Sequence, residues 1–185
     1  MTGPGPAARP GLWFTGNGGR SWSARPVPCT GMSAALSATL PAALGGGALF
    51  AVCASQPGAG FQPKWVARSA DGGRSWTRHA ACFSQACQGN PLGSGYLGSI
   101  DAVSASTVYL VGDRSPLLVT RDGGSHWSAV RAVTAGTDGG TGEVAFTSKS
   151  DGIVVGLDSG DNEAPTIWVT SDGGLRWSAL HPRIG

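Results

Sequence analysis

The amino-acid sequence predicts an all-β chain built from repeated four-stranded antiparallel sheets. Three observations carry this prediction: an eight-residue pattern that occurs four times, a short apolar run before each occurrence, and a high content of turn-forming residues. The chain has 31 glycines and 12 prolines among 185 residues, a level near that of disordered chains. The regular apolar runs between them indicate strands joined by tight turns instead.

The repeated pattern is Ser/Thr-x-Asp/Asn-x-Gly-x-x-Trp, and it occupies residues 15–22, 69–76, 120–127 and 170–177. The tryptophans that end these octets are separated by 54, 51 and 50 residues. A fixed period of about 50 residues is typical of repeat folds and lies in the range of β-propeller blades.

Each octet is predicted to be a turn between two strands. Its glycine pair supplies the positive φ that a hairpin turn requires. Its Asp or Asn side chain should accept hydrogen bonds from backbone N–H groups two residues on, and its Ser/Thr should bond to that side chain. Its tryptophan should lie over the turn and join one hairpin to its neighbour. We assign these structural roles, in preference to catalytic or metal-binding ones, to Asn17, Trp22, Asp71, Trp76, Asp122, Trp127, Asp172 and Trp177.

Taken in order, the chain begins with residues 1–11, which are rich in Pro and Gly and are expected to be disordered. Residues 12–185 are expected to form a propeller arc that starts with a half blade, 12–28. The next blade spans about 30–81, with strands near 33–40, 48–54, 64–68 and 75–79. A blade over 96–131 has strands near 99–103, 107–112, 116–120 and 126–130. The last, over 142–181, has strands near 142–147, 152–157, 166–170 and 176–180.

The number of blades follows from the octets. Four octets imply four blades, but too few residues precede the first octet to form two inner strands. The sequence therefore predicts about three and a half blades, an incomplete β-propeller. We expect it to be a fragment of a longer propeller, a truncated gene product, or a part that assembles with another chain. Such an arc exposes apolar sheet edges at both ends, and self-association through these open edges is expected.

The octets resemble the Asp-box (BNR) repeats of sialidases, sortilin-type receptors and the Ycf48-like photosystem II assembly factors. The resemblance covers nearly the whole chain. It implies that each box joins the third and fourth strands of a blade, on the rim away from the binding face. The rhythm is most similar to that of the Ycf48-like group, with Gly112 and Gly156 ending second strands. This resemblance implies a non-enzymatic scaffold or binding module with a protein partner on the propeller face. An extracytoplasmic location is favoured, although residues 1–6 show no apolar leader.

The alternative is a sialidase-type exo-glycosidase, or a carbohydrate-binding relic of one that holds a glycan on the propeller face. Sialidases pair a Tyr nucleophile with Glu, beside an Asp acid/base and an arginine cluster. No spacing pairs Tyr96 or Tyr109 with Glu143 or Glu163. In place of the Arg-Ile-Pro signature of the family stands only Arg9-Pro10. We therefore assign no catalytic residue and lean towards a non-enzyme.

Four cysteines permit two disulfides, for which the pairs Cys82 with Cys87 and Cys29 with Cys53 are candidates; buried thiols are the alternative. The spacing lacks the Cys-x2-Cys of zinc sites. Asp158, Asp161 and Glu163 form an oxygen-rich loop that is a weak Ca²⁺ candidate, and a solvated acidic loop is the simpler interpretation. No cofactor is expected.

Charge and hydropathy exclude two further classes of partner. The net charge of +2 gives no electrostatic footprint for nucleic acid. Residues 34–55 are uncharged, but Pro41 and the glycines at 45–47 make them a poor membrane span.

Overall fold

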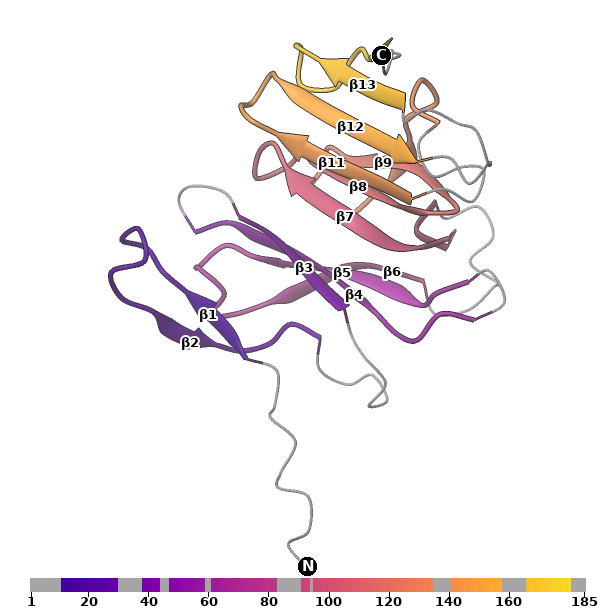
Figure 1. Cartoon of the computed structure of the whole chain (residues 1–185). Coiled ribbons are helices and arrows are strands. Elements are labelled where there is room, and N and C mark those ends of the chain that lie inside the picture. Colours follow the sequence, from indigo (N-terminus) through magenta and orange to yellow (C-terminus); the bar gives the residue numbers. More distant parts are fainter. Residues whose placement is uncertain are drawn as a thin grey trace, which may run out of the picture.

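The computed structural model describes residues 11–29, 38–43, 47–58, 61–82, 91–93, 95–134, 141–157 and 166–180. Within them the chain forms fourteen strands and one 3₁₀ turn, in four antiparallel sheets. Figure 1 shows the sheets side by side in chain order, from an N-terminal hairpin to a last four-stranded sheet. The chain is thus an incomplete β-propeller of one hairpin and three blades, as the sequence predicts.

Every sheet is a meander of strands that follow one another in the chain. Hairpin 1 consists of β1 (Leu12–Phe14) and β2 (Ser23–Arg25). Blade 2 consists of β3 (Ala38–Ala43), β4 (Leu49–Ala54), β5 (Lys64–Ser69) and β6 (Thr77–Cys82). Blade 3 consists of β7 (Tyr96–Ala102), β8 (Val108–Asp113), β9 (Ser115–Thr120) and β10 (Ser128–Ala129). Blade 4 consists of β11 (Thr141–Phe146), β12 (Gly152–Leu157), β13 (Thr166–Thr170) and β14 (Ser178–Leu180). The 3₁₀ turn η1 (Pro91–Gly93) lies between blades 2 and 3.

The strand bounds differ from the predicted ones mainly at the fourth strands. Strands expected to start at 126 and 176 start at Ser128 and Ser178, because each box keeps its tryptophan and the residue before it in the loop. The first strand of blade 2 lies later than predicted, at Ala38–Ala43. Of the residues predicted to be disordered, 1–10 lie outside the described residues.

The hydrophobic core is divided among the junctions between neighbouring blades. Side chains alternate along each strand, so a central strand serves two junctions. In β8, Val108 and Leu110 join Phe50 and Val52 of blade 2 in one cluster. The alternate side chains of β8, Tyr109 and Val111, join Val154 and Trp168 of blade 4 in another. The second strands β4 and β8 are accordingly buried on both faces, as their apolar composition predicts.

The first strands of the blades lie next to one another, with β7 between β3 and β11. Polar side chains of β7 bond the backbone of β11 directly. Ser99 Oγ lies 3.2 Å from both the amide nitrogen and the carbonyl oxygen of Val144, and the Asp101 carboxylate accepts a bond from the Phe146 N–H at 2.6 Å. Blades 3 and 4 are therefore held in fixed register at their first strands.

A disulfide between Cys29 and Cys53 joins the segment after hairpin 1 to β4, with 5.4 Å between their Cα atoms. Both sulfurs belong to a cluster with Trp65 and Ala67 of β5. Cys82 is also disulfide-bonded, whereas Cys87, its candidate partner, lies outside the described residues. In the described part of the chain, no helix has the length and apolar character needed to span a membrane.

Candidate functional site

The box at residues 69–76 shows how the octet folds. The Ser69 hydroxyl donates to Asp71 Oδ1 at 2.8 Å and accepts from the Gly73 N–H at 2.8 Å. The same Asp71 Oδ1 accepts from the Ser75 N–H at 2.9 Å, and Oδ2 accepts from the Ser75 hydroxyl at 2.6 Å. These hydrogen bonds hold the pKa of the Asp71 carboxyl far below its usual range, and the bond from the Ser75 hydroxyl has the largest effect.

The other boxes repeat this network with small changes. Thr120, Thr170 and Thr15 take the place of Ser69, and each donates to its own Asp or Asn at 2.9 to 3.0 Å. Asp122 and Asp172 accept from the N–H groups three and four residues on, and Asn17 from that of Ser21, four residues on. The prediction that the Asp or Asn side chain accepts from the backbone N–H two residues on is wrong. Two glycines at positive φ widen the loop, and the Ser/Thr hydroxyl bonds the nearer N–H groups instead.

Each full-blade box is also fastened to the first turn of its own blade. The N–H of its first glycine donates to the turn between the first two strands, in the pairs Gly72 with Gly47, Gly123 with Ser106, and Gly173 with Ser150, at 2.8 to 2.9 Å. Two of these glycines also accept a bond from the preceding sheet. Arg25 Nε donates to Gly72 O at 2.8 Å, and the Tyr109 hydroxyl donates to Gly173 O at 2.9 Å.

The box tryptophans lie on the side of each sheet that faces the preceding one. Trp76 donates through Nε1 to Pro26 O at 3.0 Å. Trp127 is buried in the apolar cluster that blade 3 shares with blade 2. The ring of Trp177 lies edge-on to the rings of Tyr109 and Phe146, with 6.0 Å between ring centres in each pair. Trp22 differs, because its side chain is 57% exposed and lies beside Gly19 of its own box.

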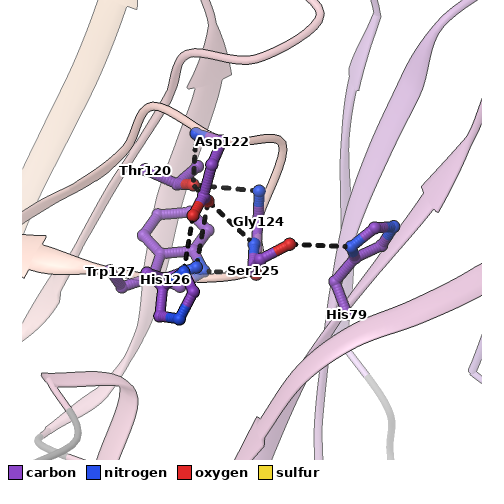
Figure 2. A network of polar contacts seen from close by, with 7 residues as sticks. All are labelled: His79, Thr120, Asp122, Gly124, Ser125, His126 and Trp127. Atoms are coloured by element: carbon purple, nitrogen blue, oxygen red, sulfur yellow. Dashed lines mark hydrogen bonds and ion pairs between the residues drawn. The ribbon is translucent and has the colours of Figure 1, made fainter.

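The third box gathers the side chains of a serine hydrolase without their geometry. Asp122 Oδ2 lies 2.6 Å from His126 Nδ1, whereas Ser125 Oγ lies 3.3 Å from Nδ1 of a different histidine, His79 of β6 (Figure 2). A catalytic triad needs one histidine between the serine and the carboxylate. Hydrogen bonds from His126 hold the pKa of the Asp122 carboxyl far below its usual range. The bond from the backbone N–H has the largest effect, followed by the bond from the side chain. This network therefore closes a turn and links two blades.

The two tyrosines considered for sialidase chemistry have partners of their own in the fold. Tyr109 is fully buried at the junction of blades 3 and 4, and burial raises the pKa of its hydroxyl. That hydroxyl bonds Gly173 and lies 3.3 Å from the Arg121 guanidinium. Tyr96 lies under the Arg114 guanidinium, at 5.9 Å from the ring centre. Glu143 is exposed on β11, and Glu163 lies outside the described residues.

Sequence reasoning missed a pocket between blade 2 and the segment that follows β2. Its volume is about 460 Å³, and it is lined by Pro26, Val27, Pro28, Trp65, Ala67, Trp76 and Arg78. Trp65 forms a buried floor, and the Arg78 guanidinium lies 4.5 Å above its ring centre. The bond from Trp76 to Pro26 closes one wall. A smaller pocket of about 280 Å³ lies beside the third box, next to Asp122 and His126.

Sequence reasoning also missed a buried lysine at the start of β5. Lys64 is 2% exposed, and its ammonium donates to Gln62 O at 3.1 Å and to Gly95 O at 2.7 Å. Burial lowers its pKa to about 8. The described residues contain no group of three or more metal-binding side chains. The Ca²⁺ candidates Asp158, Asp161 and Glu163 lie outside them.

No known protein family matches the sequence of this chain, and no curated protein matches it. A GH74 enzyme of Niastella koreensis has a similar crystal structure, with a TM-score of 0.50 and 17% identity. That match covers 74% of this chain and only 21% of the enzyme. Ycf48 bound to a D1 peptide is also similar, with a TM-score of 0.45 and 13% identity over 91% of this chain and 74% of that one. The first likeness and the observed sheets together identify the chain as a β-propeller.

Proposed function

We propose that this chain is a non-catalytic β-propeller binding module that receives a segment of a partner protein in the pocket on blade 2. The observation that carries the proposal is the lining of that pocket, in which Arg78 is the only charged residue among apolar ones. Binding sites for extended or small partners combine an apolar surface with a few polar groups that fix orientation. The Asp-box resemblance to non-enzymatic assembly factors supports the same class of function.

The pocket favours an apolar side chain with a carboxylate beside it. Trp76 is half-buried and offers an indole surface, and the exposed Arg78, whose guanidinium lies over Trp65, gives the pocket a positive charge. The Cys29–Cys53 disulfide lies behind Trp65 in the same cluster, so the floor is preformed. A preformed site lowers the entropy that binding must overcome.

The carbohydrate-binding alternative rests on the same two indoles, since sugars stack on aromatic rings. Sugar hydroxyls also need hydrogen-bonding side chains when they leave water. Here the lining side chains able to form hydrogen bonds are Arg78 and the indoles, and Trp76 Nε1 already donates to Pro26. A peptide segment fits this lining better than a glycan does.

Calorimetric titration tests the proposal. The ligands are a blocked hexapeptide that contains Leu-Asp, its analogue with Leu-Asn, and the glycan sialyllactose. We expect the Leu-Asp peptide to bind about 1.5-fold to fivefold more tightly than the Leu-Asn peptide, the range for an exposed ion pair. Arg78→Gln should remove that difference, and Trp76→Phe should weaken both peptides. Arg131→Gln, an exposed arginine outside the pocket, is the matched control. Binding of sialyllactose that depends on Trp76, with no binding of either peptide, would replace this proposal by the glycan alternative.

A further inference from the structure

The junctions between blades use the same two faces each time. We call the side of a sheet that faces the next sheet its trailing face, and the opposite side its leading face. At the junction of blades 2 and 3, Phe50 and Val52 of the trailing face pack with Trp127 of the leading face. At the junction of blades 3 and 4, Tyr109 and Val111 pack with Trp168 and, at the margin, Trp177.

Blade 4 carries a trailing face of the same kind. Ile153 pairs with Val169, and Val155 pairs with Ile167, which pairs in turn with Leu180. Their neighbours Val154 and Trp168 point the other way, into the junction with blade 3. Side-chain alternation therefore places these five aliphatic residues together on the outer face of the blade.

This face is less buried than its counterparts. By strand register, Ile153 and Val155 stand where blade 2 has Phe50 and Val52, which are fully buried. Ile153, Val155, Ile167 and Val169 are each only half-buried, and Leu180 is 49% exposed. None of the five belongs to an apolar cluster of the described residues.

The opposite end of the arc carries an exposed leading face. In hairpin 1, Trp13 and Trp22 are 60% and 57% exposed. They occupy the positions of Trp168 and Trp177 in blade 4, of which Trp168 is 5% exposed. Phe14, on the trailing side of the same hairpin, lies against Gly72 of blade 2.

The two ends are therefore the two halves of one junction, indoles at one end and aliphatic side chains at the other. We propose that the chain associates head to tail with a second copy of itself. Trp13 and Trp22 of one copy pack on the face formed by Ile153, Val155, Ile167, Val169 and Leu180 of the next. The contact continues the junction that the fold already repeats, and each large indole removes about 150–250 Å² from water. It is heterologous, so copies add in one direction, into a ring or an open chain.

This contact should be weaker than the internal junctions. In the junction of blades 3 and 4, the Tyr109 hydroxyl donates a hydrogen bond to the next blade. Ile153 takes the place of Tyr109 in blade 4, and its side chain has no hydrogen-bond donor. Asp101 of β7 also accepts a hydrogen bond from β11 of the next blade. Ala145 takes the place of Asp101 in blade 4, and its side chain cannot accept such a bond. We therefore expect reversible, concentration-dependent association.

Sedimentation velocity from about 1 to about 200 µM, a range that covers moderate affinities, tests the proposal. We expect the wild-type chain to shift from monomer to larger species with concentration. Ile167→Lys and Trp22→Ser should each be monomeric, because each loses one face. Ala179→Lys, an exposed position on the opposite side of the same sheet, is the matched control and should associate like the wild type. Circular dichroism and thermal melting verify that each variant is folded, and Trp13→Ser replaces Trp22→Ser if the latter is not.

The decisive sample is an equimolar mixture of Ile167→Lys and Trp22→Ser. The first variant keeps its indoles and the second keeps its aliphatic face, so one contact forms and a 1:1 dimer is expected. A wild-type chain that stays monomeric over the whole range overturns the proposal. A mixture that stays monomeric, or a Trp22→Ser variant that dimerises alone, also overturns it, since neither fits a head-to-tail contact. Peptide binding to the pocket on blade 2 is a separate measurement, so either proposal can fail alone.

Discussion

The phenolic hydroxyl of Tyr109 donates a hydrogen bond to the carbonyl oxygen of Gly173, 2.9 Å away, across the junction of blades 3 and 4. It ties the second strand of one blade to the box of the next. The Arg121 guanidinium donates to the same hydroxyl at 3.3 Å and to Gly174 O at 3.4 Å. Two boxes and one core strand therefore meet at a single buried oxygen.

Tyr109→Phe should lower the free energy of unfolding by about 1–2 kcal/mol, because the Gly173 carbonyl loses its buried donor. The ring and its stacking on Phe146 remain, so the junction keeps its shape. Denaturant unfolding measures the loss. A double-mutant cycle with Arg121→Gln should show coupling between the two side chains. An unchanged midpoint would mean that water replaces the hydroxyl at no cost.

Two box glycines, the second of the fourth box and the first of the first box, separate backbone strain from packing. Gly174 has φ of 80°, and a Cβ there would collide with the Tyr109 hydroxyl. Gly18 has φ of 69°, and a Cβ there would meet no atom within 4 Å. Gly18→Ala should cost about 1–2 kcal/mol from the left-handed conformation alone. Gly174→Ala should cost clearly more, because Tyr109 must also move. Thermal unfolding of the two variants compares them directly; equal losses would refute the packing contribution.

The boxes were predictable because their chemistry is local. Ser69, Asp71 and Gly73 lie within five residues, so one octet contains the donors, the acceptor and the backbone freedom that the turn needs. The apolar second strands were predictable for a similar reason, since burial on both faces requires an unbroken run of apolar residues. Because the octet recurs about every 50 residues, the number of sheets could be predicted as four.

The junctions and the pocket were not predictable, because they join residues far apart in the chain. Tyr109 and Gly173 are 64 residues apart, Ser99 and Val144 are 45 apart, and Trp76 and Pro26 are 50 apart. Each pair depends on how two sheets meet, and no local pattern encodes that relation. Trp76 was recognised as part of a box, but its role as a pocket wall appears only when Pro26 lies against it.

The box carboxylates should make the fold sensitive to acid. Hydrogen bonds lower the pKa values of Asp71, Asp122 and Asp172 in the folded state. A depressed folded pKa contributes stability above the unfolded value, near pH 4, and that stability is lost as the pH falls below it. The free energy of unfolding should therefore decline from about pH 4 downwards.

Asp71→Asn isolates one of these contributions. The first box already has an amide in this place, where Asn17 Nδ2 donates to Ser21 Oγ at 2.8 Å. The variant should therefore keep the turn, lose some stability at pH 7 and show a shallower decline below about pH 4. Urea unfolding at pH 7, 4 and 3 measures the two slopes. An identical acid slope in variant and wild type would exclude Asp71 as a contributor.

Lys64 predicts a change at the opposite end of the pH scale. Burial lowers its folded pKa to about 8, against about 10.4 in an unfolded chain. Between these values the unfolded chain holds a proton that the folded chain has released, so the free energy of unfolding should rise from about pH 8 to about pH 10. Lys64→Met should abolish this rise and also lose about 1–3 kcal/mol at pH 7, because the Gln62 and Gly95 carbonyls lose their donor. The exposed Lys149, replaced by Met, is the matched control and should leave the profile of the wild type unchanged. A rise that survives in Lys64→Met would assign the titration to another group.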